Sequence, residues 1–419
     1  MKVLSAVFAT SQHMGRVQVK IENGLISAVG DLGFSRDQID FYFEDDCLAF
    51  CGMGDIHIHA REDVSQKNIY KEDFHSASLA AINGGVTFTA DMPNNPIAPI
   101  DDESYLGKLA LINRSKIPLF IYAGIGPGTS PLSFKVPYKA YMGPSVGELF
   151  FKDDLELEQA IERYRGQWVS FHCEDPVELA KHSHAPTHAE RRPQSCEILA
   201  THTALRLIET YGLNGKLCHY SAGEGLALIR AAKERGVSVT CEVTPQHLYF
   251  SLDQLENPTL YQMNPPIRER SDCEQLLEGL RSGVIDYLAT DHAPHTMEEK
   301  MKGTSGLTGL DTYAPLVAWL LKEKGFDPKL VARFVAESPG RFVNQFLDSI
   351  SHHNHLYQKL GRGVGFLETG YAANFCVLEF TPHKIEKKNL KTKVGHSPFE
   401  GHTLPGKAKA VFSLGERLL

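Results

Sequence analysis

Apolar runs of strand length alternate with longer amphipathic stretches through the middle of the chain. Several of the longer stretches end at a glycine, the residue that most often terminates a helix, and they predict helices at residues 74–83, 155–164, 197–211, 225–235 and 272–281. Eight apolar runs occur, at residues 54–60, 86–92, 119–125, 138–142, 168–173, 216–221, 237–243 and 285–290. Eight strands, each followed by a helical stretch, predict an α/β fold with a (β/α)8 barrel of the TIM type.

The two ends of the chain have a different pattern. Residues 1–50 contain short alternating strands with a turn at Glu22-Asn23-Gly24, and short strands resume at residues 375–378 and 408–414. We therefore predict a small β-sandwich domain built from residues 1–50 plus 365–419. It would lie beside a barrel formed by residues 51–364.

Composition excludes several classes of function. The apolar fraction of 42% and the charged fraction of 22% are those of an ordinary soluble protein. A formal net charge of −8 argues against a nucleic-acid-binding surface, and the chain has no apolar run long enough to predict a membrane span. The eight cysteines form no C-x-x-C pair, so we expect buried free thiols and a cytoplasmic location.

The first candidate chemistry lies at the end of the first predicted barrel strand. His57 and His59 are two residues apart, so on a strand both side chains point to the same face and can bind one metal ion. The preceding Asp55 is a candidate to orient one of the two rings. An isolated H-x-H pair is nevertheless more often structural than metal-binding.

Further ligand-type residues follow other predicted strands. Strand five ends in His172, strand six in His219 and strand eight in Asp291, while strand four carries Lys139 on its face. Barrel active sites lie at the carboxyl ends of the strands, where these residues would meet. Each of them alone could be structural, but together they predict a metal centre.

The number of candidate ligands indicates two metal ions. Four histidines and one aspartate are too many for one tetrahedral zinc, and they suit two ions about 3.5–4 Å apart. Such a pair needs a bridging anion. Lys139 is costly to bury as a charged ammonium, but as a neutral amine it can react with CO₂ to form a carbamate whose two oxygens bridge the ions.

Seven motifs, in order along the chain, resemble the dihydroorotases of the cyclic amidohydrolase family. They are HIHARE (57–62), DMPN (91–94), KAYMG (139–143), FHCED (171–175), LCHYS (217–221), TCEVTPQHL (240–248) and ATDHAPH (289–295). The resemblance covers nearly the whole chain. It is greatest to the forms with a bridging lysine carbamate, including the dihydroorotase domain of the animal multifunctional pyrimidine enzyme.

The resemblance implies a role for each matching residue. It implies two Zn²⁺ per chain, bridged by carbamylated Lys139 and a hydroxide. One ion would be bound by His57, His59 and Asp291, and the other by His172 and His219. Asp291 would also act as general acid and base. The substrate-binding residues would be Arg61, Asn94 and His295 at the substrate carboxylate and Asn264 at the pyrimidine ring. The implied reaction is the reversible, zinc-dependent cyclisation of N-carbamoyl-L-aspartate to L-dihydroorotate in pyrimidine biosynthesis.

Alternatives stay open at this stage. The chain could be a related cyclic amidase, either an allantoinase or a dihydropyrimidinase (hydantoinase), although Arg61 and His295 favour a more acidic substrate. It could also be a catalytically inactive scaffold for aspartate transcarbamoylase, although such relatives usually lose metal ligands. We expect a homodimer, and association with aspartate transcarbamoylase is a further option. We also expect the glycine-rich residues 303–309 to form a loop that closes over the substrate.

Overall fold

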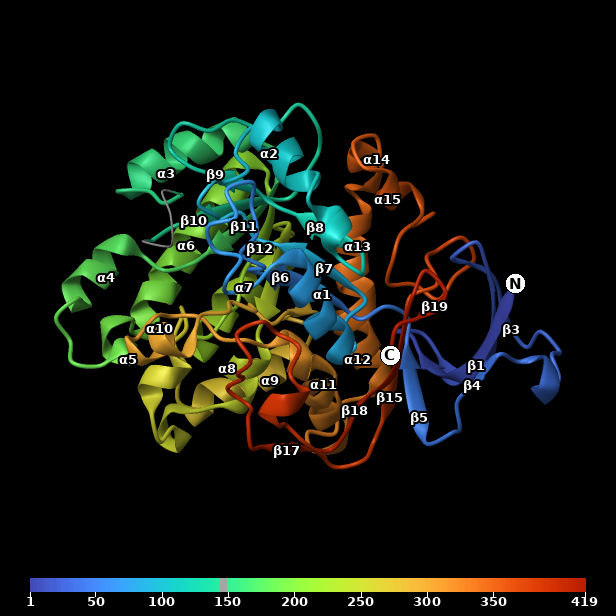
Figure 1. Cartoon of the computed structure of the whole chain (residues 1–419). Coiled ribbons are helices and arrows are strands. Elements are labelled where there is room, and N and C mark those ends of the chain that lie inside the picture. Colours follow the sequence, from blue (N-terminus) through green and yellow to red (C-terminus); the bar gives the residue numbers. More distant parts are fainter. Residues whose placement is uncertain (144–148) are drawn as a thin grey trace.

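A ring of parallel strands lies at the centre of the computed structural model (Figure 1), which describes residues 1–143 and 149–419. The ring strands overlap the eight apolar runs of the sequence. In chain order they are β6 (Gly54–Ile58), β7 (Phe88–Asp91), β8 (Leu119–Ile121), β9 (Ala123–Ile125), β10 (Tyr138–Tyr141), β11 (Trp168–His172), β12 (Asn214–Leu217), β13 (Val239–Val243) and β14 (Tyr287–Leu288).

The ring closes on itself and has eight positions. Strands β8 and β9 are consecutive pieces of one position, because β8 pairs with β7 while β9 pairs with β10. All neighbouring strands pair in parallel. Just beyond β14, His292 forms a parallel bridge to Ile58 at the end of β6. The predicted (β/α)8 barrel is therefore confirmed.

Helices surround the strands (Figure 1). The predicted helix at residues 74–83 coincides with α1 (Phe74–Asn83), whose N-cap residue Asp73 accepts a hydrogen bond from the Ser76 backbone amide. The remaining α-helices are α2 (Asp102–Leu109), α3 (Asp154–Ile161), α4 (Pro176–His182), α5 (His188–Arg191), α6 (Gln194–Tyr211), α7 (Leu226–Glu234), α8 (Pro245–Tyr249), α9 (Arg270–Arg281), α10 (Met297–Met301), α11 (Tyr313–Lys322), α12 (Pro328–Ala332), α13 (Ser338–Asn344), α14 (Leu347–Ile350) and α15 (His355–Gln358).

Strands from both ends of the chain form a separate mixed sheet beside the barrel (Figure 1). Strand β5 joins the two ends, because it pairs in parallel with β1 and antiparallel with β15. This confirms a β-domain built from both termini, whereas the boundaries at residues 50 and 365 stay predictions. The strands are β1 (Lys2–Ala9), β2 (Met14–Glu22), β3 (Leu25–Gly30), β4 (Phe41–Tyr42), β5 (Cys47–Phe50), β15 (Phe375–Glu379), β18 (Lys407–Ser413) and β19 (Glu416–Arg417), while β16 (His383–Lys384) and β17 (Thr403–Leu404) pair separately.

The interior is apolar and its thiols are reduced. Phe342 on α13 packs against Tyr122, Trp168 and Tyr287, so one ring contacts three strand positions of the barrel. All eight cysteines are buried and free, as predicted. Within residues 1–143 and 149–419, none of the helices combines the length and apolar character needed to cross a membrane.

Asp55 joins the first barrel strand to the residues that follow the last one. Its carboxylate accepts hydrogen bonds from the Thr290 hydroxyl at 2.5 Å, from the Thr290 amide at 3.2 Å and from the His57 amide at 3.1 Å. The expectation that Asp55 orients an imidazole ring is therefore wrong. The aspartate instead holds the backbone that precedes Asp291.

We predict that Asp55→Ala destabilises the barrel. It would leave the buried Thr290 amide and hydroxyl without their acceptor, which is expected to lower the free energy of unfolding by about 2–4 kcal/mol. Urea unfolding followed by circular dichroism measures the change. The exposed Asp37→Ala serves as control, and equal urea midpoints for the two variants would contradict the assigned role.

Candidate metal centre and active site

Six side chains predicted as metal ligands meet at the carboxyl ends of the barrel strands. His57 is the last but one residue of β6, His172 is the last residue of β11, and Lys139 is the second of the four residues of β10. The other three lie one to three residues beyond the ends of β6, β12 and β14; they are His59, His219 and Asp291. All six are buried. Because the strands are parallel, their carboxyl ends all lie at the same rim of the barrel, which brings these residues together.

Three of the side chains form one ligand group. The Asp291 Oδ1 atom lies 3.0 Å from His59 Nε2 and 3.3 Å from His57 Nε2. The ligand atoms of the three residues all lie within 4.8 Å of one another. Two imidazole nitrogens and a carboxylate oxygen are ligand types that zinc commonly takes.

The other two histidines form a second group beside the first. His172 Nδ1 lies 2.9 Å from His219 Nε2, so these two ring nitrogens converge. The ring centroids of His57 and His219 are 5.2 Å apart, which places the second group next to the first. Two adjacent groups of ligands suit two ions better than one.

Lys139 is buried, with its Nζ atom 5.2 Å from the centre of the Tyr141 ring. It is 0% exposed, and its Nζ atom has no hydrogen-bond partner among residues 1–143 and 149–419. An unpaired ammonium in such a position is very costly. Conversion of the amine to a carbamate would replace the cation by an anion beside metal ions, so the residue fits a bridging carbamate.

The protonation states of the ligands suit metal binding. Burial lowers the pKa of His57 to about 4, against the opposing effect of Glu242, and the charge of Lys139 lowers it further. Burial also lowers the pKa of His172 and of His219. Burial alone would raise the pKa of Asp291, but His57 and His59 lower it below its usual value. Neutral imidazoles and a carboxylate are the forms that bind metals.

The second nitrogens of the rings are held by neighbouring residues. His57 Nδ1 is 2.6 Å from Glu242 Oε1, and His59 Nδ1 is 2.7 Å from Asn94 Oδ1. His172 Nε2 is 2.8 Å from Glu174 Oε2. Such contacts fix the orientation of each ring and leave its other nitrogen for the metal.

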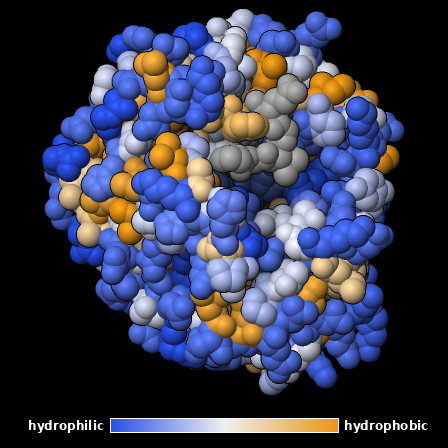
Figure 2. Space-filling view, turned by 90° about the vertical axis from the view of Figure 1, so that its left-hand side faces the viewer, coloured by the Kyte–Doolittle hydropathy of each residue, from blue (hydrophilic) through white to orange (hydrophobic). Residues whose placement is uncertain are grey.

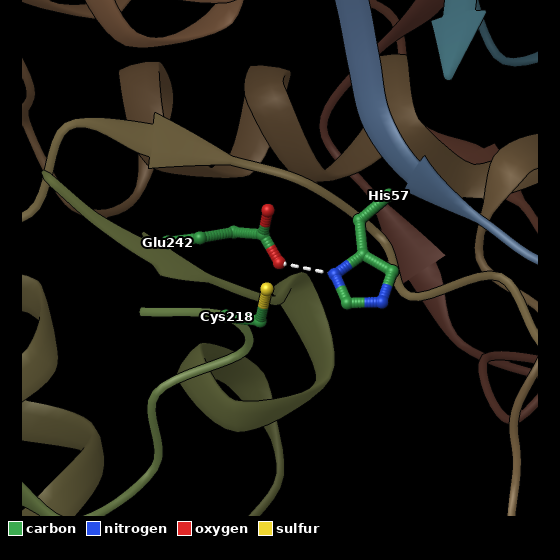
Figure 3. Close-up of side chains that lie close together, drawn as sticks. All are labelled: His57, Cys218 and Glu242. Carbon is green, nitrogen blue, oxygen red and sulfur yellow. Dashed lines mark hydrogen bonds and ion pairs between the residues drawn. The ribbon is translucent and has the colours of Figure 1, made fainter. Parts of the chain in front are cut away.

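Glu242 and Cys218 lie close to the His57 ring (Figure 3), with Glu242 at the Nδ1 atom, whereas Asp291 lies near the Nε2 atom. Their ligand atoms are close enough to suggest a metal site of their own. However, Glu242 Oε1 already contacts His57, and Glu242 Oε2 lies 2.5 Å from Lys216 Nζ. Because both carboxylate oxygens have partners, this group is better explained as the support that holds His57.

Three site residues have left-handed backbone conformations. The φ angles are +62° at Arg61, +36° at His219 and +47° at Asp291. Residues other than glycine are strained in this region of φ, and such strain tends to occur at functional sites. Here it lets the chain turn sharply where each of these residues leaves its strand or loop.

One cavity of about 290 Å³ joins the two ligand groups to the predicted substrate residues. Arg61, Asn94, Asn264 and His295 all line it, together with His57, His59, Tyr141, His172, His219, Asp291, Ala293 and residues 304–306. The face of the molecule in Figure 2 is hollowed, and the residues around the hollow are mostly hydrophilic. The cavity therefore suits a small polar molecule.

The polar groups in this cavity differ in charge. The Arg61 Nη2 atom lies 3.2 Å from His295 Nε2. Burial lowers the pKa of His295 to about 3, with additional contributions from Arg61 and Lys71, so this imidazole is neutral near pH 7. In the described part of the chain, the buried Oδ1 atom of Asn264 has no hydrogen-bond partner. The cavity thus offers a fixed cation, a neutral imidazole and an amide oxygen.

Sequence reasoning missed the residues that support the ligands. Glu242, Lys216 and Glu174 lie in quoted motifs or apolar runs, but none received a role. For Lys216 and Glu242 the available signal was a charged residue inside a buried strand, which is rare unless the charge is paired. Tyr141, also unassigned, lines the cavity, and its buried hydroxyl has no hydrogen-bond partner within the described ranges.

Solved structures with the same fold are cyclic amide hydrolases. The L-hydantoinase (dihydropyrimidinase) from Arthrobacter aurescens has a TM-score of 0.86 and 22% sequence identity, covering 99% of this chain and 95% of that one. The D-hydantoinase (dihydropyrimidinase) from a Thermus species has a TM-score of 0.82 and 19% identity, covering 100% and 95%. At these identities the likeness establishes the fold alone.

Curated relatives carry one name. A protein named dihydroorotase from Geobacillus sp. strain WCH70 is 34% identical over 417 residues, which cover 93% of this chain and 92% of the relative. A protein of the same name from Archaeoglobus fulgidus is 30% identical, and the match covers 91% of this chain and 88% of the relative. Another from Pyrococcus furiosus is 27% identical, covering 99% of this chain and 91% of the relative. Comparison with models of protein families gives no match. On the strength of its curated relatives, the chain belongs to the dihydroorotase family of cyclic amide hydrolases.

Proposed function

We propose that this protein is a dinuclear zinc dihydroorotase that closes N-carbamoyl-L-aspartate into L-dihydroorotate and reopens it. One observation carries the proposal: Arg61, in contact with His295 at 3.2 Å, lines the same cavity as two groups of metal-type ligands. A buried guanidinium is suited to bind a carboxylate, and both proposed substrates carry an α-carboxylate that takes no part in ring closure.

Two zinc ions bridged by carbamylated Lys139 complete the proposed site. His57, His59 and Asp291 would hold one ion, and His172 and His219 would hold the other. The absence of a hydrogen-bond partner for Lys139 Nζ among the residues described supports a modified lysine. When bound, the two ions would polarise the ring amide and lower the pKa of a water molecule.

The chain's own residues bind the substrate and move the proton. Arg61, Asn94 and His295 would hold the carboxylate, which fixes the ring against the metal centre. The free Oδ1 atom of Asn264 would accept a hydrogen bond from a ring N–H group. Asp291 would take a proton from the attacking water and deliver it to the departing ring nitrogen, because a carboxylate with a lowered pKa is ionised before the reaction.

Two alternatives fit the site less well. An allantoinase or a dihydropyrimidinase would share the metals. Its substrate would be less acidic, so the buried cation of Arg61 would be less useful there. A scaffold for aspartate transcarbamoylase would not require all six ligands. The proposal also includes a role in pyrimidine biosynthesis and a cytoplasmic location. It further includes a homodimer and an association with aspartate transcarbamoylase.

Asp291→Asn is expected to remove proton transfer while keeping a ligand oxygen. Zinc-loaded wild-type protein should open L-dihydroorotate, and the variant's kcat should be about 100- to 10,000-fold lower. Ultraviolet absorbance follows the reaction, with zinc measured in the same sample. The exposed Asp348→Asn is the control. A wild-type protein with two zinc ions that turns over only cyclic amides lacking a carboxylate would contradict the proposal.

Lys139→Ala is expected to remove the bridge between the ions. The variant should bind fewer than two zinc ions per chain and lose turnover, and a short carboxylate such as propionate should partly restore both by occupying the vacated space. Metal analysis and initial rates measure the effect. The exposed Lys135→Ala should behave as wild type, and full zinc content with full activity in Lys139→Ala would refute the carbamate.

Arg61→Gln is expected to slow turnover of an acidic substrate without slowing turnover of a neutral one. Loss of a hydrogen bond to a charged group should lower kcat/KM for L-dihydroorotate by about 10- to 100-fold. Slow turnover of dihydrouracil, which has no carboxylate, should be unchanged. The exposed Arg36→Gln is the matched control. Equal losses on both substrates would show that Arg61 has only a structural role.

A further inference from the structure

Lys300, the fourth residue of the short helix α10, is a buried lysine surrounded by backbone carbonyls. It is 1% exposed, and its Nζ atom donates to the carbonyls of Gln262 at 2.8 Å, Thr304 at 2.9 Å and Gly306 at 2.9 Å. No carboxylate lies within 4.0 Å of Nζ in the described ranges, so neutral acceptors alone satisfy the ammonium.

The three carbonyls belong to two walls of the active-site cavity. Thr304 and Gly306 line the cavity directly, and Gln262 lies two residues before Asn264, which also lines it. The Gly306 amide donates to the same Gln262 carbonyl at 2.9 Å. One side chain therefore ties the segment after strand eight to the segment that presents Asn264.

The neighbouring geometry shows how closely this wall is packed. Gly306 has a φ angle of +135°, and a Cβ atom there would lie 2.6 Å from the Ala293 carbonyl and 2.9 Å from His295. The Ala293 amide donates to the Leu307 carbonyl at 2.7 Å. Hydrogen bonds thus hold this wall on two sides, from Ala293 to Leu307 and from Gly306 to Gln262.

A buried ammonium without a counter-ion needs an explanation. Burial lowers the pKa of Lys300 to about 7, whereas three carbonyl acceptors favour its charged form. Three carbonyl oxygens that converge would repel one another without a donor between them. An apolar side chain of similar length would fill the space but could not hold these oxygens together.

We propose that Lys300 is a positioning residue that fixes residues 304–306 against the Asn264 segment, so that this part of the cavity is formed before substrate binds. The inference rests on the proposed function for the identity of the substrate. It replaces the expectation that residues 303–309 close over the substrate. In this account the glycines of that stretch allow close packing rather than a hinge motion.

Hydrogen–deuterium exchange of wild-type, zinc-loaded protein tests the preformed wall without any variant. The peptide covering residues 302–309 is expected to be protected in the absence of ligand, and N-carbamoyl-L-aspartate should add little protection. Rapid exchange that becomes slow when N-carbamoyl-L-aspartate binds would overturn the proposal. Protection in a protein that fails to turn over dihydroorotate would refute the proposed function and leave the positioning role intact.

Substitution of Lys300 tests which side chain holds the wall. Lys300→Met is expected to speed exchange in residues 302–309 and to raise KM for L-dihydroorotate by about tenfold, with little change in kcat or zinc content. Lys300→Arg, which keeps the donors, should restore part of the loss. Lys302→Met is the control, because Lys302 is exposed and pairs with the exposed Glu298. Exchange and KM in Lys300→Met equal to those of the control would overturn the proposal.

Discussion

The burial of Lys139 is the constraint on which the rest of the site depends. The Lys139 amine is 0% exposed and has no hydrogen-bond partner in the described ranges, and burying an ammonium group in this way costs free energy. Five candidate metal ligands end at the same rim of the barrel, and burial lowers the pKa of three of them, His57, His172 and His219. In the proposed site, a carbamate would replace this unpaired ammonium by an anion, and two cations would bind the ring nitrogens that converge there.

The barrel supplies this arrangement through its support as much as through its ligands. Glu242 holds His57 and is itself neutralised by Lys216, while Asp55 ties the first strand to Thr290, the residue before Asp291. The strained backbone at His219 and Asp291 is maintained by this packing. A buried charged side chain also supports the cavity wall. There the Lys300 ammonium donates to three backbone carbonyls, whereas Lys216 pairs with the carboxylate of Glu242.

The meeting of the candidate ligands could be predicted from the sequence, because parallel strands end at one rim and strand order alone brings His57 and Asp291 together; their role as metal ligands stays a prediction. The supporting residues could not, because a partner such as Glu242 depends on which side chains face each other across neighbouring strands. Asp55 shows the opposite error: its proximity to His57 in sequence suggested a ring contact, whereas barrel closure turns it toward Thr290. The break between β8 and β9 was likewise hidden within one apolar run.

Anomalous X-ray diffraction at the zinc edge, on crystals of zinc-loaded protein, tests the central claim most directly. The account predicts two peaks on either side of the Lys139 side chain, one bound by His57, His59 and Asp291 and the other by His172 and His219, with continuous density for a carbamate between them. A single peak, or a peak among His57, Cys218 and Glu242, would contradict it.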